Sequence, residues 1–452
     1  MEDQNSFLGT EPVGKLLLKL ALPTLAAQII NMLYNIVDRI YIGHIPEVGS
    51  LALTGVGVCL PLIMIVSAFA YLVGSGGAPR ASIFMGQKRK DQAERTLGNC
   101  FATQIVFSIV ITITLLLFNK PLLLAFGASE NTIMYATQYM NIYAIGTLFV
   151  QLTLGMNIFI TAQGFAKTGM YSVLIGAVTN IVLDPIFIFG FGLGVRGAAL
   201  ATIISQSLSC IWVLSFLFGK KTVLKLKREY FKIEKSIILP CLALGTATFI
   251  MQASESVISV CFNASLLRYG GDIAVGAMTI LMSVMQFAML PLQGIGQGSQ
   301  PIISYNFGAK NKKRVVDTYK LLLKVSLCYS ITLWACIMLF PQIFAGMFTS
   351  NVELLEFTKV ALRIFCAVLC IFGIQTACQL TFTSIGNAKA SIMVAVTRKF
   401  ILLVPLIYIM PRLMSHNPTM GIYMAEPIAD LLAVTFTACL FTHQFKKSLK
   451  AM

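Results

Sequence analysis

Charged side chains are scarce in this sequence of 452 residues: they make up 12% of it, against about 25% in a typical soluble domain. Hydrophobic residues make up 57%, and the mean hydropathy is +0.81. Apolar runs long enough to cross a bilayer recur along the whole chain. This composition excludes a soluble globular protein, and a transmembrane β-barrel would show short alternating segments instead. We therefore predict an all-α polytopic membrane protein.

The chain also has only three His, and its eleven Cys include no CxxC motif. None of the His lies near a cluster of other metal ligands, so the sequence offers no structural zinc site. Paired His, a nucleophile elbow or a metal motif at membrane depth would indicate a membrane-embedded enzyme, and we find none. We therefore expect a protein that is not an enzyme, with no cofactor and no metal ion other than Na⁺ as a coupling ion.

The apolar runs predict twelve transmembrane helices. They cover residues 16–42, 51–74, 95–118, 133–160, 168–191, 196–218, 236–262, 273–297, 315–340, 357–382, 391–411 and 420–443.

The Lys and Arg residues behind the net charge of +16 are concentrated in alternate loops. They gather in residues 85–95, 219–235 and 308–314 and at the C-terminus, whereas loops 43–50 and 341–356 contain none. Because basic loops stay in the cytoplasm, and because the number of helices is even, we place both termini there. The distribution indicates topology and not nucleic-acid binding. We expect a multi-pass protein of the cell membrane that contacts lipid.

The second half of the chain repeats features of the first half. Most matched residues are 222 positions apart: Gly74 and Gly296, Gly76 and Gly298, Pro79 and Pro301, Gly86 and Gly308, Thr161 and Thr383, Gly164 and Gly386, Ala166 and Ala388, Lys167 and Lys389. The sequence therefore predicts an N-terminal six-helix bundle (1–218), a basic cytoplasmic linker (219–235) and a C-terminal six-helix bundle (236–452). Parallel repeats of this kind are related by an axis along the membrane normal, and substrate binds between them.

Five carboxylates lie within the predicted spans: Asp38, Asp184, Glu255, Glu426 and Asp430. An ionised side chain in hydrocarbon costs roughly 2.5 to 17 kcal/mol, so such groups are rare unless they have a role. They usually bind a cation, relay a proton or pair with a buried base. Their presence makes this chain a candidate ion-coupled transporter.

Four polar side chains of the first half fall at one depth in the membrane. A rise of 1.5 Å per residue places Asp38 roughly 8 Å and Thr202 roughly 9 Å below the outer ends of their helices. Asn180 and Asp184 are four residues apart in the outer half of the fifth span, so they share one helix face. These oxygen ligands suit Na⁺, and two carboxylates that approach closely can also hold H⁺. The sequence does not distinguish the two ions.

A structural explanation exists for both aspartates. Asp38 could pair with the adjacent Arg39, and Asp184 could order the turn before Pro185. Neighbouring side chains on a helix do not face each other, which weakens the first explanation. We therefore favour cation binding.

Several stretches resemble the multidrug and toxic compound extrusion (MATE) family. They are the first-span stretch LPTLAAQIINMLYNIVDRIYIG, the fifth- and sixth-span stretch TNIVLDPIFIFGFGLGVRGAALAT, and the two GQK and GAK loops. The most specific part is N-x-x-x-D-P followed by G-A-A-L-A-T, and the resemblance covers essentially the whole chain. It implies two bundles that form a V-shaped cleft, and export of cationic and amphipathic compounds driven by entry of Na⁺ or H⁺.

The resemblance also implies particular site residues. The family's first cation site matches Asp38, Asn180, Asp184 and Thr202. Tyr139 and Asn157 fall where the family lines the same cavity. Together with residues that share a helix face with Asp38 or Glu255, they give the predicted substrate cleft: Asn31, Tyr34, Tyr139, Asn157, Met251, Gln252 and Glu255.

The acids of the second half leave alternative roles open. Glu255 is the repeat counterpart of Asp38. It either draws a cationic substrate into the cleft or binds a proton, or it is held by hydrogen bonds between helices, away from the cleft. Some family members pair such an acid with an aspartate on the tenth helix, but residues 357–382 contain no carboxylate. Arg398 and Asp430 lie at comparable depths on neighbouring spans, so we predict a structural ion pair between them. Glu426 precedes Pro427 and could lie at a hydrated turn.

Together these features predict an antiporter that exports small organic cations as a monomer. The nearest rival is a flippase for lipid-linked oligosaccharides with a related architecture. Such a protein needs several cationic side chains in its central cavity to bind pyrophosphate, whereas the charges within the membrane are mostly acidic here.

Overall fold

The computed structural model describes residues 7–452, which contain helices and no strand. The first half consists of α1 (Phe7–Thr10), α2 (Val13–Gly43), α3 (Gly49–Gly86), α4 (Lys90–Ala125), α5 (Ile133–Ile145), α6 (Thr147–Ala162), α7 (Ala166–Pro185), the π-helix η1 (Ile186–Gly190) and α8 (Val195–Phe218).

After a 3-10 turn in the linker, η2 (Arg228–Tyr230), the second half begins. It consists of α9 (Lys235–Gly308), α10 (Lys312–Leu339), α11 (Pro341–Gly346), α12 (Val352–Phe365), the 3-10 turn η3 (Leu369–Ile371), α13 (Phe372–Ser384), α14 (Ala388–Val396), the π-helix η4 (Thr397–Leu403), α15 (Val404–Leu413) and α16 (Pro418–Ala451).

Nine helices in the described part of the chain are long and apolar enough to cross a membrane. The number rises to eleven when two bent pairs each count as one span: α5 and α6, bent by 59°, and α12 and α13, bent by 46°. The 74-residue α9 would be roughly 110 Å long if straight. It breaks at Gly271 (φ 66°, ψ −162°), a conformation that glycine tolerates, so α9 crosses twice. The predicted all-α fold with twelve spans is confirmed.

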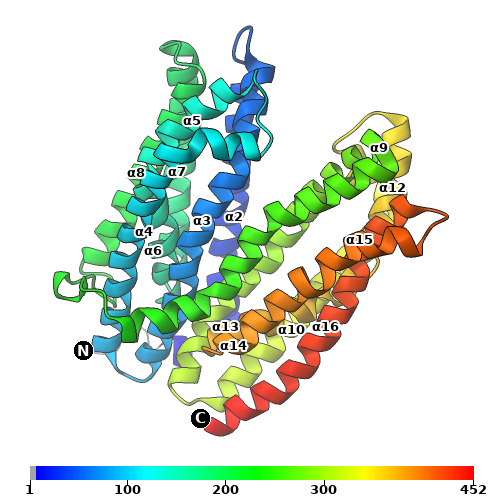
Figure 1. The fold of residues 1–452 in the computed structure, drawn as a ribbon. Helices are drawn as coiled ribbons and strands as arrows, with labels where there is room; N and C mark the ends of the chain where they lie inside the picture. The colour runs from blue at the N-terminus through cyan, green and yellow to red at the C-terminus, as the bar shows by residue number, and fades with distance from the viewer. Residues whose placement is uncertain (1–6) are drawn as a thin grey trace.

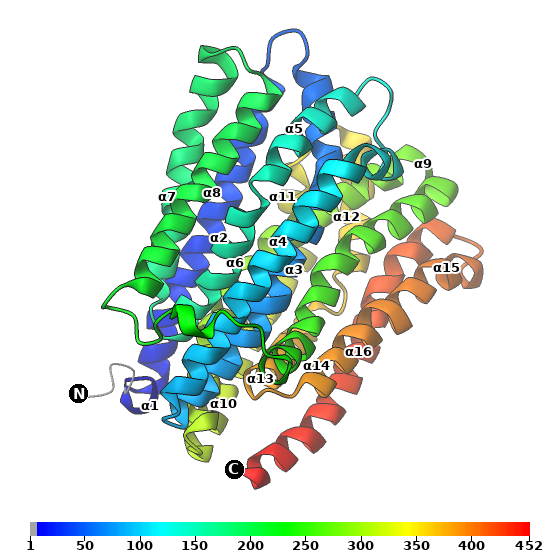
Figure 2. The same cartoon turned by 60° about the vertical axis from the view of Figure 1, so that its left-hand side comes forward.

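The helices form two bundles arranged as a V (Figure 1). The N-terminal bundle contains α2 to α8, and the C-terminal bundle contains α9 to α16. The bundles meet at the end of the molecule that contains α1 and the C-terminus, which we call the base, and they diverge toward the opposite end. The view turned by 60° shows the basic linker crossing the base between α8 and α9 (Figure 2).

The hydrophobic core follows the same division. One cluster near the base contains residues of both bundles, among them Leu16 of α2, Val73 of α3 and Ile302 of α9. Away from the base, one cluster contains residues of α2 to α8 alone and another contains residues of α9 to α16 alone. Apolar burial therefore holds the bundles together at the base and leaves each bundle with its own core farther out.

Polar contacts between the bundles join α2 to the second half of α9. The Thr24 hydroxyl of α2 donates to the Gly294 carbonyl at 2.9 Å. Gln28 Nε2 donates to Gln297 Oε1 at 3.5 Å. α2 is thus a helix of the N-terminal bundle that directly contacts the C-terminal bundle.

The linker is attached to the base of the N-terminal bundle. Gln163, in the turn between α6 and α7, accepts hydrogen bonds at 2.8–2.9 Å from the Thr222 hydroxyl and from the next two backbone amides. Lys227 lies 2.6 Å from the buried carboxylate of Glu94 on α4. The linker therefore packs as part of the first bundle.

Candidate functional site

A pair of carboxyl groups is buried in the N-terminal bundle. Asp38 of α2 is 9% exposed and Asp184 of α7 is fully buried, and their side chains lie within hydrogen-bonding reach of each other. Asp184 is placed at the end of α7, where Pro185 begins the transition to the π-helix η1. Two carboxylates in contact repel each other unless a proton or a metal cation lies between them.

Asn180 and Thr202 complete a cluster with these two acids. Asn180 Nδ2 donates to Asp184 Oδ1 at 3.5 Å and to Thr202 Oγ1 at 3.4 Å. The Thr202 hydroxyl donates to the carbonyl of Ala198, one turn earlier on α8. Its proton is thus used, and a lone pair remains to accept or to bind a cation. The structure brings together the four residues that the sequence placed at one depth.

Three oxygens of this cluster have no hydrogen-bond donor within the described residues: Asp38 Oδ1, Asn180 Oδ1 and Asp184 Oδ2. Buried polar atoms are normally paired, because an unpaired one loses its hydration without compensation. Carboxylate and amide oxygens are ligands that hard cations prefer. The cluster thus presents three buried, unpaired oxygens of the chemical type that binds small hard cations.

Two tyrosines of the predicted cleft lie with this cluster inside the N-terminal bundle. The side chain of Tyr139 on α5 lies near Thr202 and interacts electrostatically with Asp38. Tyr34, one turn before Asp38 on α2, interacts electrostatically with both carboxylates. The other two predicted polar residues of this half lie elsewhere: Asn157 donates to the Gly169 carbonyl of α7 at 3.3 Å, closer to the base, and Asn31 is exposed on α2.

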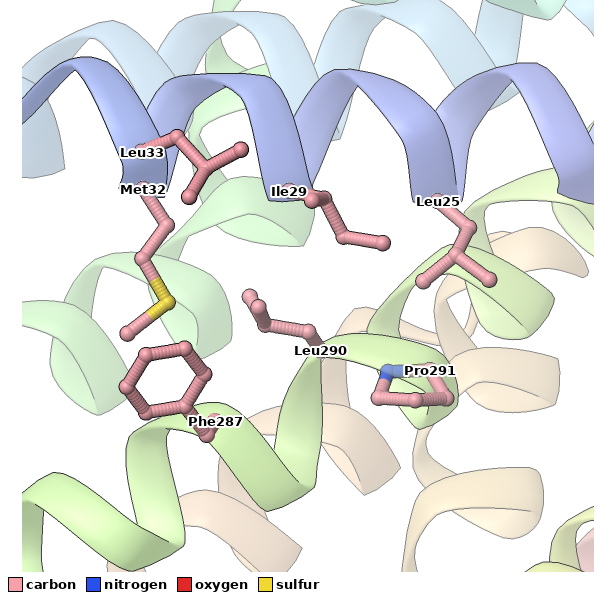
Figure 3. Close-up of a pocket in the computed structure, with 7 residues that line it drawn as sticks. All are labelled: Leu25, Ile29, Met32, Leu33, Phe287, Leu290 and Pro291. Carbon is pink, nitrogen blue, oxygen red and sulfur yellow. The ribbon is translucent and has the colours of Figure 1, made fainter. Parts of the chain in front are cut away.

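An apolar cavity of about 270 Å³ lies between the two bundles. Figure 3 shows the side chains of α2 above it and those of α9 below it. The lining residues are Leu25, Ile29, Met32, Leu33, Phe287, Leu290 and Pro291. None of the seven residues predicted to form the substrate cleft lines this cavity. The wall that the bundles share is thus more apolar than the sequence suggested.

The C-terminal bundle contains a cluster of ion pairs. Arg398 of η4 donates from Nε to Asp430 Oδ1 at 2.7 Å, as predicted, and also from Nη2 to Glu426 Oε1 at 3.0 Å. Its guanidinium lies 4.8 Å from the ring centroid of Phe372. Glu426 therefore belongs to an ion pair, and the hydrated turn considered from the sequence does not describe it.

Lys399 is a charged residue of this cluster that sequence reasoning missed. Its ammonium lies 2.6 Å from Glu255 Oε1. Arg398 and Lys399 are adjacent and both buried, and both lie on a π-helix, a rare geometry that is frequent at functional sites. A lysine next to an arginine in an otherwise apolar run was the signal available in the sequence. Of the two uses considered for Glu255, the structure shows contact with another helix, through an ion pair.

Comparison with known proteins identifies the family. A family model described as MatE matches residues 23–186 and 247–409, which together make up most of the chain and fall one in each bundle. The chain belongs to the MatE family. The predicted family is thereby confirmed, as is the expectation that the protein is a transporter and not an enzyme.

Individual relatives are distant but match over nearly their full length. The multidrug export protein MepA of Staphylococcus haemolyticus is 24% identical over 437 residues, which cover 96% of this chain and 95% of MepA. An outward-facing structure of a multidrug resistance MATE family transporter of the MOP superfamily superposes with a TM-score of 0.91 at 22% identity, covering 99% of both chains.

A second solved structure has the same fold. It is a MOP superfamily transporter from Pyrococcus furiosus, with a TM-score of 0.88, 22% identity, and coverage of 100% of this chain and 99% of that one. That protein is described as having a binding pocket of reverse polarity, which suggests a different function for it. The cargo of the present chain must therefore be argued from its own residues.

Proposed function

We propose that this MatE family protein is a secondary active antiporter that exports cationic and amphipathic organic compounds in exchange for Na⁺ or H⁺. The observation that carries the proposal is the buried pair Asp38 and Asp184, which offers unpartnered oxygens to a cation. The similarity to MepA, a multidrug export protein, supports the cargo class.

The position of α2 suggests how the two binding events are coupled. This helix contributes Asp38 to the carboxylate pair and Leu25, Ile29, Met32 and Leu33 to the cavity between the bundles. A cation that neutralises Asp38 removes the repulsion between α2 and α7 and so changes the packing of α2. Because α2 lines the cavity between the bundles, the shape of the cavity changes when α2 moves. By linkage, the cation weakens cargo binding by the same factor as cargo weakens cation binding.

The membrane potential supplies part of the energy. One charge that crosses 100 mV contributes about 2.3 kcal/mol, before any concentration gradient is counted. We propose that the base of the V faces the cytoplasm, since it carries the basic loops and both termini. The carboxylate pair, in the outer half of its bundle, then receives its cation from outside the cell. We propose that the protein works as a monomer in the cell membrane.

The flippase alternative is less well supported by the ion pairs. Binding of a pyrophosphate needs cationic side chains that are free to contact it. Arg398 and Lys399, the two bases of the C-terminal cluster, already contact Asp430, Glu426 and Glu255. The N-terminal cluster contains acids and neutral polar groups. This charge distribution favours a cationic cargo.

An energised-vesicle assay tests the proposed function. Inverted membrane vesicles receive a Na⁺ gradient or a pH gradient separately, and uptake of a fluorescent organic cation such as ethidium is followed. We expect one gradient to drive uptake in the wild type and Asp184→Asn to abolish the gradient-driven part. Glu353→Gln, an exposed acid on α12, serves as the control with the same charge change. Uptake that is indifferent to both gradients, or unaffected by Asp184→Asn, would overturn the proposal.

A further inference from the structure

The ion-pair cluster of the C-terminal bundle carries more negative than positive charge. It contains three carboxylates, Glu255 on α9 and Glu426 and Asp430 on α16, and two bases, Arg398 and Lys399 on η4. With every group ionised, the cluster is one positive charge short of neutrality. An unbalanced charge at membrane depth is costly, so the cluster has room, electrostatically, for one further monovalent cation.

The two bases are held very differently. Arg398 is fixed from three sides, by Asp430, by Glu426 and by the face of Phe372. Lys399 forms one ion pair in the described part of the chain, with Glu255. The ammonium of a lysine sits on a flexible four-carbon chain and can turn to a new partner. A guanidinium bound by two carboxylates cannot turn without breaking at least one of those hydrogen bonds. Lys399 is therefore the movable cation of the cluster.

Glu426 is a second carboxylate of the same cluster, and it pairs at 3.0 Å with Arg398, the residue next to Lys399. Glu426 interacts electrostatically with Lys399 as well as with Arg398. Arg398 already satisfies Asp430 at the shorter distance of 2.7 Å, against 3.0 Å to Glu426. A shift of the ammonium from Glu255 toward Glu426 would keep Lys399 paired and leave Glu255 free. The displacement therefore creates no unpaired buried base, which is the costly outcome for a buried ion pair.

Glu255 is the accessible member of the cluster. Its side chain is 45% exposed, whereas that of Lys399 is 6% exposed. The next residue, Ser256, contacts Met64 of α3 in the other bundle, with 4.0 Å between hydroxyl and sulfur. Two turns earlier on α9, the ring of Phe249 lies 5.0 Å from that of Phe69 on α3. Glu255 thus stands beside the contact between the bundles, where a cargo would pass.

From this arrangement we infer that Lys399 is a built-in competitor for the cargo at Glu255. In the cargo-free protein the Lys399 ammonium is paired with the Glu255 carboxylate. A monovalent organic cation takes its place at Glu255, Lys399 turns to Glu426, and the cluster becomes neutral. Lys399 then sets specificity: a cation must bind Glu255 better than a tethered ammonium does, and neutral or anionic compounds cannot displace it. This inference rests on the proposed export of organic cations.

Equilibrium binding to the purified full-length protein in nanodiscs tests this inference. The probes are tetraphenylphosphonium, a monovalent organic cation, and triphenylphosphine oxide, a neutral compound of similar shape. We expect Lys399→Met to tighten tetraphenylphosphonium binding by roughly tenfold or more, since a charged competitor is removed, and to leave binding of the neutral compound unchanged. Adding Glu255→Gln to Lys399→Met should remove the gain.

A matched control removes a lysine from an ion pair elsewhere in the same bundle. Lys359 pairs with Glu356 on the surface of α12, and Lys359→Met should leave both affinities unchanged. Lys399→Arg provides a second readout should Lys399→Met fail to fold. A guanidinium holds the carboxylates more firmly, so tetraphenylphosphonium should then bind more weakly than to the wild type. An affinity that neither Lys399 variant changes, or an equal gain for the neutral probe, would overturn the inference.

The outcomes also separate this inference from the proposed function. If the wild type transports the organic cation under an ion gradient but Lys399→Met binds it as the wild type does, the competitor role alone is wrong. If the wild type neither binds nor transports organic cations, the proposed function fails, and the role of Lys399 fails with it.

Discussion

Gly86 and Gly308 make the same contact in opposite directions at the base of the V. Gly86 lies against the backbone carbonyl of Tyr305, and Gly308 lies against that of Ile83. The two glycines are 222 residues apart, and so are Ile83 and Tyr305. The contact is therefore self-complementary, as contacts across a two-fold axis are. The internal repeat is thus also the symmetry of the closed end of the molecule.

The first prediction concerns this glycine contact. A Cβ on either glycine would overlap the facing carbonyl oxygen, so Gly86→Ala and Gly308→Ala must push α3 away from the second half of α9. Overpacking of this kind costs about 1–3 kcal/mol. We expect each variant to unfold at a lower temperature in detergent. We also expect a cysteine introduced at the base to react faster with a fluorescent thiol reagent than it does in the wild-type background.

Gly57→Ala is the matched control, because Gly57 lies on the same helix with nothing within 4 Å of its added Cβ. Alanine is favoured over glycine within a helix by roughly 0.5–1 kcal/mol, so this variant should be equally or more stable. If Gly86→Ala and Gly57→Ala behave alike, the close packing at the base does not hold the bundles together.

The second prediction concerns Arg398. Its removal leaves the buried Asp430 without its base and takes from Glu426 its hydrogen-bonded partner, and breaking a buried pair costs about 3–5 kcal/mol. Arg398→Leu should therefore destabilise the protein severely. Adding Asp430→Asn should recover part of the loss and adding Glu426→Gln a further part, as measured by unfolding in a detergent titration. Equal stability of the single and triple variants would show that these side chains do not act as a unit.

The third prediction concerns the linker and pH. The hydrogen bond to Glu94 raises the pKa of Lys227 above its usual 10.5. Because the pKa is raised in the folded state, the pair stabilises the docked linker fully below pH 10.5 and loses this effect as the pH rises through the higher value. Cleavage of the linker by subtilisin should therefore accelerate above pH 10.5 in the wild type. In Lys227→Met it should be faster at neutral pH and lack that acceleration.

The fourth prediction concerns Asn180, which bridges Asp184 and Thr202. Asn180→Ala removes one cation ligand and the hydrogen bonds that orient two others. Loss of such an orienting group typically weakens ion binding by 10–100-fold. We expect the concentration of coupling ion needed for half-maximal transport to rise by about tenfold or more, with a smaller change in maximal rate. An unchanged ion dependence would remove Asn180 from the site.

The spans, the repeat and the N-terminal cluster could be predicted because each depends on local properties of the chain. Length and hydropathy define a span, and residues spaced by four share a helix face. With topology and rise, this placed Asp38, Asn180, Asp184 and Thr202 at one depth, and the structure has them together. The bends between α5 and α6 and between α12 and α13 were not predicted, because neither length nor hydropathy marks a break inside a span.

Lys399 was missed for a specific reason. An α-helical interpretation of the eleventh span puts adjacent residues on different faces, so one buried partner for Arg398 was sought and found in Asp430. The π-helix over Thr397–Leu403 changes that phase, and both bases then point into the bundle. No sequence pattern predicts a π-helix. The ion pair between Glu255 and Lys399 was therefore not predicted.

The central claim is that a cation at Asp38 and Asp184 opposes the binding of cargo. The most direct measurement is the affinity of purified protein for tetraphenylphosphonium as a function of Na⁺ concentration at fixed pH, and of pH without Na⁺. The account predicts that affinity falls as Na⁺ or H⁺ rises in the wild type, and that this dependence disappears in the double variant Asp38→Asn, Asp184→Asn. A wild-type affinity that neither ion changes, or a dependence that survives in the double variant, would contradict it.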